Sequence, residues 1–149
     1  MPALDAAVTV LRDRGLRVSS ARRLVLEALY RSPGPIPAES IAGGLSGRLP
    51  RSDLASVYRN LDTLEQIGLV RRLHLGHGPA LYGMATEPRD YLVCERCRSL
   101  TTVDPARLDG VRAAIRQAFG FRASFDQFPI VGMCLACESR KAVADSVGA

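Results

Sequence analysis

The residues of this chain with the clearest chemical potential are its four cysteines, which form two Cys-x-x-Cys pairs, Cys94/Cys97 and Cys134/Cys137. A Cys-x-x-Cys turn sets two sulfurs at the spacing that one tetrahedral ion needs, and two such turns complete a shell of four thiolates. A closed shell leaves no position for water or substrate, so the sequence predicts one structural zinc per chain. The alternative is a redox disulfide within each pair, which a reducing compartment disfavours.

A second candidate site lies on a helix predicted within residues 51–70. Its apolar positions are spaced by three, four and three residues, which places them on one buried stripe and leaves the opposite face polar. These positions are Leu54, Val57, Leu61 and Leu64. Ser52 is predicted to cap the start of the helix, and Gly68 is predicted to end it.

The polar face of this helix carries groups that bind phosphates and base edges in protein–DNA complexes. The candidate DNA-binding residues on it are Arg51, Ser52, Ser56, Tyr58, Arg59 and Asn60. Arg17, in the loop before the second predicted helix, is placed to touch the DNA backbone. A solvated amphipathic helix in an ordinary bundle would show a similar pattern, so the assignment depends on the surrounding domain.

The segments around this helix predict a winged helix-turn-helix domain. Apolar periodicity predicts three helices before it, at residues 2–14, 20–31 and 37–45. After it, residues 69–75 and 80–82 flank a Gly-His-Gly-Pro turn, which is the pattern of a β-hairpin. This hairpin would be the wing, and its Arg71 and Arg72 would either contact phosphates beside the major groove or be solvated.

The remaining residues predict a small α/β module. Strands are predicted at residues 91–94, 100–103, 121–125 and 128–131, and one helix at residues 105–119. Asp104 and Pro105 form a helix start, and Gly120 a helix stop. Four apolar residues on one side of this helix are predicted to lie on the sheet: Leu108, Val111, Ile115 and Ala118.

The predicted fold class is α+β, with an N-terminal winged helix-turn-helix domain and a small C-terminal α/β domain. The exposed edge of so small a sheet favours pairing with a second copy, and a dimer would present two recognition helices to a two-fold operator. The predicted boundaries are 1–84 for the DNA-binding domain, 85–90 for a hinge, 91–140 for the dimerisation domain with its zinc, and 141–149 for a flexible tail.

Positive charge is concentrated in the first half of the chain. The net charge is +5, and residues 1–85 hold 11 arginines and 7 acids, whereas residues 86–149 hold 9 basic and 8 acidic residues. The front half therefore has a net charge of +4 and the back half of +1. This distribution favours nucleic acid as the partner of the front half.

Five segments of the chain are similar, in order and spacing, to those of the Fur (ferric uptake regulator) family of metal-responsive repressors. They are residues 15–22, 55–61, 68–70, 92–97 and 132–137. The resemblance spans about residues 10–137 and implies a homodimer, an N-terminal winged helix, a C-terminal dimerisation domain and a four-cysteine structural zinc. It also implies that Arg17, Tyr58 and Arg59 fall where the family touches DNA.

The chain departs from the family pattern at a second metal site, through which family members sense metals or peroxide. That site uses a histidine-rich segment before the first cysteine pair, an acidic residue on the wing strand and a histidine ahead of the third helix. Here residues 87–92 contain no histidine, Gly83 stands at the acidic position, and the third-helix histidine is replaced around Pro35. A third family site would map near Asp90, Asp109 and Asp126, with oxygen ligands only.

These departures predict that the usual sensing site is lost, which puts a second, regulatory metal in doubt. His74 and His77 are the only histidines, and they are either salvage ligands or ordinary exposed or phosphate-contacting side chains. Arg89 would supply a permanent charge near Asp90 or Glu87 that holds the hinge closed and makes DNA binding constitutive. The alternative is an effector that the sequence does not name.

The predicted function is a dimeric, cytoplasmic transcriptional repressor that binds double-stranded operator DNA, with a structural zinc and weak or no metal control. Alternatives are a redox-sensing repressor that ejects zinc on cysteine oxidation, a metal-responsive regulator with non-standard ligands, and a protein-binding winged helix. An enzyme is not predicted, because all four cysteines belong to one closed site and no three-ligand zinc with a nearby base is present. No apolar run of membrane-spanning length occurs.

Overall fold

The computed structural model describes residues 2–74, 78–86, 89–125 and 129–148. The predictions made for His77, Glu87 and Asp126 lie outside these residues. The chain divides into two compact units, Met1–Glu87 and Pro88–Ala149, and this division falls within the segment predicted as the hinge. Each unit has its own three-stranded sheet. No helix of the described residues combines the length and apolar composition needed to cross a bilayer.

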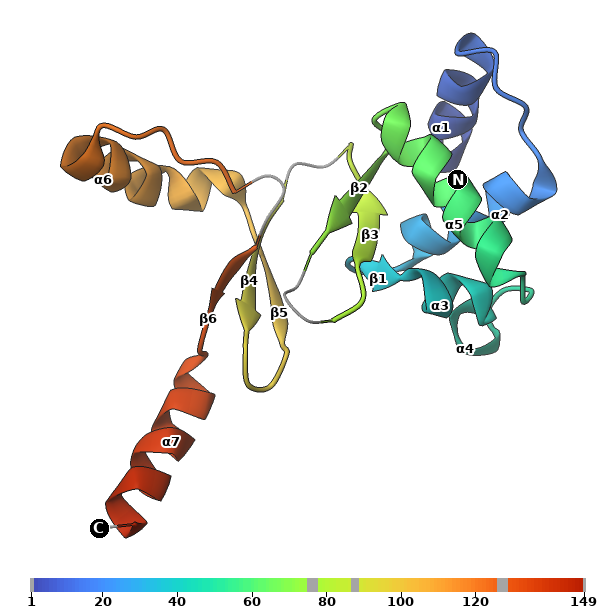
Figure 1. Cartoon of the computed structure of the whole chain (residues 1–149). Coiled ribbons are helices and arrows are strands. Elements are labelled where there is room, and N and C mark those ends of the chain that lie inside the picture. The colour runs from blue at the N-terminus through green and yellow to red at the C-terminus, as the bar shows by residue number, and fades with distance from the viewer. Residues whose placement is uncertain (1, 75–77, 87–88, 126–128, 149) are drawn as a thin grey trace. The chain divides into compact units, whose positions relative to one another are not determined.

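Unit 1 is a helical bundle with a small sheet (Figure 1). Its helices are α1 (Pro2–Asp13), α2 (Ser20–Arg31), α3 (Ala38–Ala42), α4 (Gly44–Gly47) and α5 (Leu54–Gln66). The predicted helix at 37–45 therefore ends at Ala42, and α4 is a short left-handed turn in which Leu45 and Ser46 have φ values of +50° and +59°. The break occurs at Gly44, whose φ is +75° and where a Cβ would lie 2.3 Å from the Leu49 carbonyl oxygen, so only glycine fits.

The core of unit 1 forms where α2 and α5 pack against each other and against α1, α3 and the sheet. The side chains exposed by 1% or less at its centre include Leu11, Val25, Leu26, Ile41, Val57, Leu61, Leu64 and Tyr82. Three of the four predicted apolar positions of α5 are thus confirmed as core. The fourth, Leu54, is 38% exposed because it occupies the first helical position, beyond the packed length of the stripe.

Both ends of α5 are set by local chemistry. Its N-cap is Asp53, whose carboxylate accepts a hydrogen bond from the Ser56 amide at 2.9 Å. The prediction that Ser52 is the cap is wrong by one residue, since Asp and Ser cap helices about equally well and only the fold decides between them. At the other end, Gly68 has a φ of +78°, which confirms the predicted stop.

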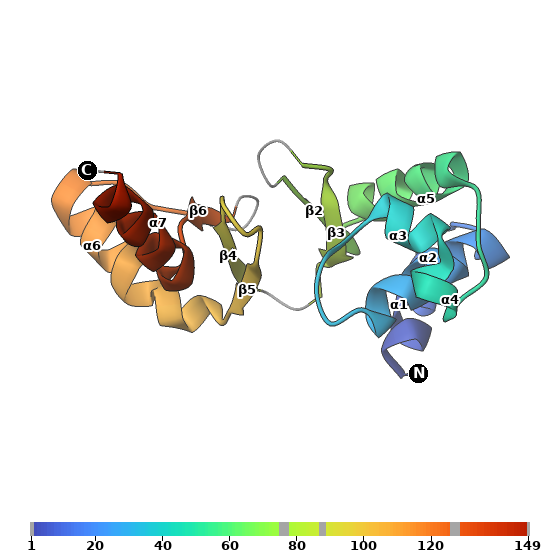
Figure 2. The ribbon, with the colours of Figure 1, turned by 90° about the horizontal axis from the view of Figure 1, so that it is seen from below.

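The sheet of unit 1 has the order β1-β3-β2, with β1 (Ile36–Pro37), β2 (Val70–Leu73) and β3 (Leu81–Met84). The strands β2 and β3 form the predicted antiparallel wing hairpin, with Arg72 opposite Tyr82. Figure 1 and Figure 2 both show this hairpin beside the helices. The two-residue strand β1, which pairs with β3, was not predicted because a strand this short has no periodicity.

Unit 2 is built on a sheet of order β5-β4-β6, with β4 (Asp90–Cys94), β5 (Leu100–Val103) and β6 (Ile130–Gly132). β4 pairs antiparallel with β5 and parallel with β6. A 3-10 turn (Pro105–Leu108) leads into α6 (Asp109–Phe119), and α7 (Leu135–Val147) follows β6. The helices α6 and α7 leave the sheet at opposite ends (Figure 1).

Two of the secondary-structure predictions for unit 2 are wrong, and a third is confirmed. Residues 121–125 form no strand, although apolar Phe121, Ala123 and Phe125 alternate there with polar residues, because the segment runs back along α6 instead of pairing with the sheet (Figure 1). The tail after residue 140 is not irregular, since α7 continues to Val147. The helix that starts after Asp104 does end at Gly120, which has a φ of +60°.

The apolar side of α6 is not covered by the sheet within one chain, contrary to the prediction. No residue of α6 is buried, Val111 is 43% exposed, and Phe119 is 79% exposed. Leu108, which precedes the helix, is the one predicted contact that is buried. The amphipathic pattern is correct, but the surface that covers it does not lie among the described residues of the same chain.

Candidate metal centre and nucleic-acid interface

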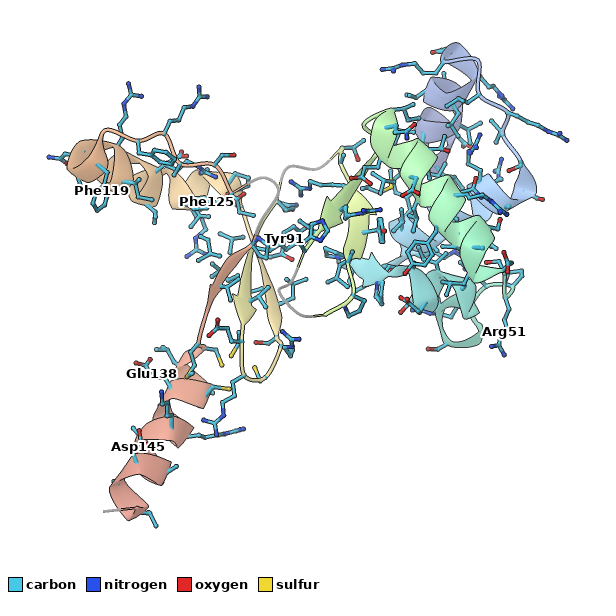
Figure 3. The ribbon with its side chains drawn as sticks, in the orientation of Figure 1. Arg51, Tyr91, Phe119, Phe125, Glu138 and Asp145 are labelled. Carbon is cyan, nitrogen blue, oxygen red and sulfur yellow. The ribbon has the colours of Figure 1, made fainter. Side chains whose placement is uncertain are left out.

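The four cysteines meet at one end of the unit 2 sheet, as Figure 3 shows by the yellow sulfur atoms. Cys94 ends β4, and the turn that follows carries Cys97. The parallel pairing of β4 with β6 sets Gly132 beside Cys94. Cys134 then caps the start of α7, and Cys137 lies in its first turn. Strand pairing and helix start together bring the two Cys-x-x-Cys pairs to one place.

The spacing of the sulfurs fits a tetrahedral ion. All four Sγ atoms lie within 4.8 Å of one another, and those of Cys97 and Cys134 are 3.9 Å apart. Zinc–sulfur bonds of about 2.3 Å in tetrahedral geometry require sulfurs roughly 3.8 Å apart. The cysteines are free rather than paired in disulfides. Four soft ligands at this spacing suit zinc, and no ligand position is left open for a substrate.

The thiols of this cluster differ in their readiness to ionise. The Cys134 amide points at the Cys94 sulfur from 3.4 Å, which lowers the pKa of that thiol to about 6. Ser99 Oγ lies 3.1 Å from the Cys97 sulfur and lowers the pKa of the Cys97 thiol. The Cys134 thiol and burial raise the pKa of Cys137 to about 12. Without metal, the Cys94 thiol therefore ionises more readily than the Cys137 thiol.

The candidate DNA-binding residues of unit 1 lie on and just before α5, and in the loop before α2. The guanidinium-bearing residues Arg17, Arg51 and Arg59 are exposed, and Ser52, Ser56 and Tyr58 are half-buried. Figure 3 shows Arg51 immediately before α5. The Tyr58 hydroxyl donates to the Glu39 carboxylate at 3.0 Å, which raises the pKa of Tyr58. The three arginines are therefore accessible, whereas the Ser52 hydroxyl is buried and has no hydrogen-bond partner among the described residues, contrary to its prediction as a DNA contact.

Asn60 was predicted to be an exposed DNA-binding residue, but it is buried, with only 8% of its surface exposed. Its amide nitrogen donates to the Ser56 carbonyl at 3.0 Å, and its amide oxygen accepts from Arg22 Nε at 3.1 Å. Arg22 in turn donates to the Arg17 carbonyl at 2.7 Å. Asn60 is therefore a positioning residue that ties α5 to the loop carrying Arg17.

Arg22 was missed by the sequence analysis as a functional residue. It lies inside the 15–22 segment that carried the family resemblance, which was the available signal. The sequence does not reveal that Asn60, 38 positions further along the chain, accepts a hydrogen bond from Arg22. Its role is to join the two segments that present candidate DNA contacts.

The wing arginine Arg72 has protein partners. Its guanidinium lies 3.0 Å from the Asp62 carboxylate and 3.5 Å from that of Glu65, and it stacks over the Tyr82 ring at 5.4 Å. These contacts tie β2 to α5. Arg72 therefore braces the wing against α5, and a phosphate contact, one of the two roles predicted for it, would have to compete with two carboxylates.

The positions at which the family resemblance expects regulatory ligands in unit 1 are in apolar contact. A Cβ at Gly83 would lie 3.6 Å from Pro35 Cγ, so the two residues are neighbours on β3 and just before β1. Neither side chain offers a ligand atom. His74 is exposed at the end of β2. Among the described residues, the four cysteines are the only group of three or more potential ligands close enough to share one ion.

In unit 2, a guanidinium stands between two of the predicted oxygen ligands. Arg112 donates to Asp90 at 2.5 Å and lies 3.4 Å from the Asp109 carboxylate, and it also donates to the Pro105 carbonyl at 2.7 Å. The Asp90 side chain is only 1% exposed. Arg112, from α6, thus supplies a fixed positive charge to Asp90 that was not predicted from the sequence, in addition to the charge predicted for Arg89.

Comparison with known proteins agrees with these features. A sequence model described as the ferric uptake regulator family matches residues 13–127. The peroxide operon regulator of Bacillus subtilis is 28% identical over 138 residues, which cover 93% of this chain and 95% of that protein. A peroxide-responsive repressor of Staphylococcus saprophyticus is 26% identical and covers 92% of this chain and 93% of that protein.

Solved structures show the same fold. The ferric uptake regulator of Vibrio cholerae has a TM-score of 0.66 at 26% identity, covering 85% of this chain and 98% of that chain. The ferric uptake regulator of Helicobacter pylori, whose structure reveals three functional metal-binding sites, has a TM-score of 0.69 at 23% identity. The match covers 91% of this chain and 93% of that chain. With its winged-helix unit, its clustered cysteines and a family match over most of its length, the chain belongs to the ferric uptake regulator family of transcription regulators.

Proposed function

We propose that this protein is a dimeric repressor that binds operator DNA through α5, holds one structural zinc through Cys94, Cys97, Cys134 and Cys137, and binds DNA without a second, regulatory metal. The single observation that carries the last point is the Arg112 guanidinium between Asp90 and Asp109. The DNA-binding part is supported by the exposed arginines of a winged-helix unit with a basic front half.

Operator binding would use the residues at the start of α5 and in the loop before α2. Arg17, Arg51 and Arg59 would bind phosphates or base edges, with Ser56 and Tyr58 beside them. Asn60 would act indirectly, because its amide is held inside unit 1. Because several guanidinium groups would contact DNA phosphates, the affinity for the operator would fall steeply as the salt concentration rises.

Dimerisation would cover the apolar surface that α6 leaves open. Exposed apolar residues gather in unit 2 on the sheet and around α6; they are Leu92, Val111, Phe119, Phe121, Val131 and Met133. An apolar surface of this kind favours association with another protein surface. A second copy of unit 2 would supply it with the two-fold symmetry that a pair of recognition helices needs.

Loss of the sensing site is supported by the side chains at its expected positions. Pro35 and Gly83 offer no ligand atoms. At the third site, Asp90 is already neutralised by a buried ion pair, and a divalent cation would have to displace Arg112 and repel its charge. A guanidinium is always protonated at physiological pH, so this cation does not respond to metal supply.

The experiment that tests the proposal is elemental analysis of the purified dimer before and after strong chelation, combined with operator titrations. One zinc per chain that survives chelation, and an operator affinity that does not change with added iron, manganese, nickel or zinc, are the expected results. A second metal per chain that is required for DNA binding would contradict the loss of the sensing site. Absence of salt-dependent binding to duplex DNA would contradict the DNA-binding function.

One observation favours a second candidate, a redox-sensing repressor. Cys97 is exposed and has a lowered pKa, and thiolates at exposed positions are the ones that oxidise. Oxidation of one Cys-x-x-Cys pair would remove two ligands and release zinc. Zinc loss together with operator release at low peroxide, with no effect of chelator alone, would support this candidate. Zinc retention at peroxide levels that inactivate thiol sensors would contradict it.

A further inference from the structure

Unit 2 contains a cavity of about 480 Å³ between α6 and the segment that returns along it after Gly120. It is lined by Arg112, Ala113, Arg116, Arg122, Ala123 and Ser124. Figure 1 shows the returning segment as an orange trace beside the helix. Three of the six lining residues are arginines, and none of the described lining residues is acidic. The volume falls within the range of small-molecule sites.

The charge of this cavity is only partly neutralised. Arg112 is paired with Asp90 and Asp109. Arg116 and Arg122 are exposed, and neither guanidinium has an ion pair or hydrogen bond to any residue within 89–125 or 129–148. Within the described part of unit 2, Arg116 and Arg122 therefore bring two positive charges without a counterion to the cavity, from two different segments.

We propose that this cavity binds a small oxyanion carrying two negative charges, either a phosphate or a dicarboxylate. The planar guanidinium offers parallel N–H donors that match the oxygens of such groups and form bidentate, charge-assisted hydrogen bonds. Arg116 and Arg122 supply the two ligating groups, and Arg112, which also lines the cavity, adds positive potential. The cavity excludes free metal cations by charge. This site goes beyond the proposed function, because neither zinc nor DNA binding requires it.

Arg112 and Arg116 are four residues apart on α6, so their side chains are neighbours along one face of the helix. Arg122 comes from the segment that returns along this helix, so two separate elements supply the arginines of the cavity.

The test is calorimetric titration of the full-length, zinc-loaded dimer with inorganic phosphate and with succinate, at constant ionic strength. The variant is R116Q/R122Q, and the matched control is R140Q, which removes an exposed arginine from α7. We expect saturable binding of one anion per chain in the wild type and in R140Q, and binding weakened by roughly tenfold or more in R116Q/R122Q. Zinc content and thermal unfolding check that the variants are folded.

The outcomes separate the proposal from its rivals. Absence of saturable binding of either anion, or equal binding by wild type and R116Q/R122Q, would overturn it. A DNA phosphate is the other source of the same chemistry, so operator affinity is measured in parallel without added anion. An unchanged operator affinity in R116Q/R122Q supports a site for a free anion. A loss of roughly tenfold would assign these arginines to DNA and overturn the proposal, while leaving the repressor function intact.

Discussion

Arg112 Nη2 lies 2.5 Å from Asp90 Oδ2, and the Asp90 carboxylate is 1% exposed while the Arg112 side chain is 25% exposed. The pair joins α6 to the first residue of β4 across 22 positions of sequence. It is reinforced by the Phe125 ring, which lies 5.3 Å from the Arg112 guanidinium carbon. A carboxylate so completely removed from water depends on this one cation for its charge compensation.

Removing the Arg112 charge is expected to destabilise unit 2. R112Q leaves the Asp90 carboxylate buried without a counterion, and we expect the free energy of unfolding to fall by about 2–4 kcal/mol. This is somewhat less than the cost of breaking a fully buried ion pair, because Arg112 is partly exposed. Urea unfolding of the zinc-loaded protein measures it. D109N is the matched control, because Asp109 is 75% exposed and its ion pair is worth only about 0–1 kcal/mol. Equal losses in the two variants would contradict the central role of the Asp90 pair.

Removal of one zinc ligand is expected to unfold the cysteine end of unit 2. C94S takes away a ligand that also accepts the Cys134 amide, so both the zinc and the contact of α7 with β4 should be lost. Zinc content, circular dichroism and size-exclusion chromatography are the measurements, and we expect no zinc and no dimer. S139A, on the exposed surface of α7, should behave as wild type. A folded, dimeric C94S would rule out a structural role for the metal.

Zinc affinity is expected to rise with pH. Only thiolates bind zinc, so every thiol still protonated in the metal-free protein must release its proton on binding. The pKa of Cys94 is about 6, so this thiol is ionised at neutral pH, whereas Cys137, with a pKa of about 12, is protonated. Protons therefore compete with zinc throughout the range between these values. Competition with a chromophoric chelator from pH 6.5 to 8.5 checks this, and a pH-independent affinity would be the contrary result.

Arg59 is expected to contribute directly to operator binding and little to folding. It is exposed on α5, and R59A should weaken operator binding by roughly 1–3 kcal/mol if the guanidinium contacts a base, without shifting the unfolding midpoint. Fluorescence anisotropy at fixed salt measures the affinity. R12A, an exposed arginine near the end of α1, controls for loss of net charge. If R12A and R59A weaken binding equally, Arg59 acts only through the overall field.

Asn60 is expected to behave differently from Arg59, because its side chain is an internal tie. N60A removes the acceptor of Arg22 Nε and should cost about 1–2 kcal/mol of folding stability, as well as weakening operator binding through the freed Arg17 loop. Thermal unfolding and anisotropy are measured on the same samples. Normal folding stability together with weakened operator binding in N60A would instead indicate that Asn60 contacts DNA directly.

The parts of the fold that local signals determine were predictable from the sequence. The helix predicted at residues 20–31 matches α2, since its apolar periodicity lies within the segment and Ser19, the residue just before it, caps its start. The cysteine cluster was predictable for the same reason, because the Cys-x-x-Cys spacing fixes half of the site locally.

What could not be predicted depends on tertiary partners. The burial of Asn60 requires Arg22, and the pairing of Asp90 requires Arg112, and neither partner is marked by spacing or motif. The expectation that α6 packs on its own sheet was wrong because an amphipathic pattern shows that a face must be covered but not by which surface. Residues 121–125 have strand-like composition yet lie beside a helix, where backbone pairing is absent.

The strand β4 is held at both of its ends, by Asp90 at one and by Cys94 at the other. These anchors are about 13 Å apart at the usual rise per residue. Each anchor secures a different helix, α6 through a guanidinium and α7 through the cysteine cluster. Unit 2 should therefore unfold locally, at one end of β4 independently of the other. Loss of zinc would release α7 from β4, while the ion pair between Arg112 and Asp90 still holds α6. Such a locally unfolded form would bind zinc and re-form the cysteine cluster without refolding the whole of unit 2.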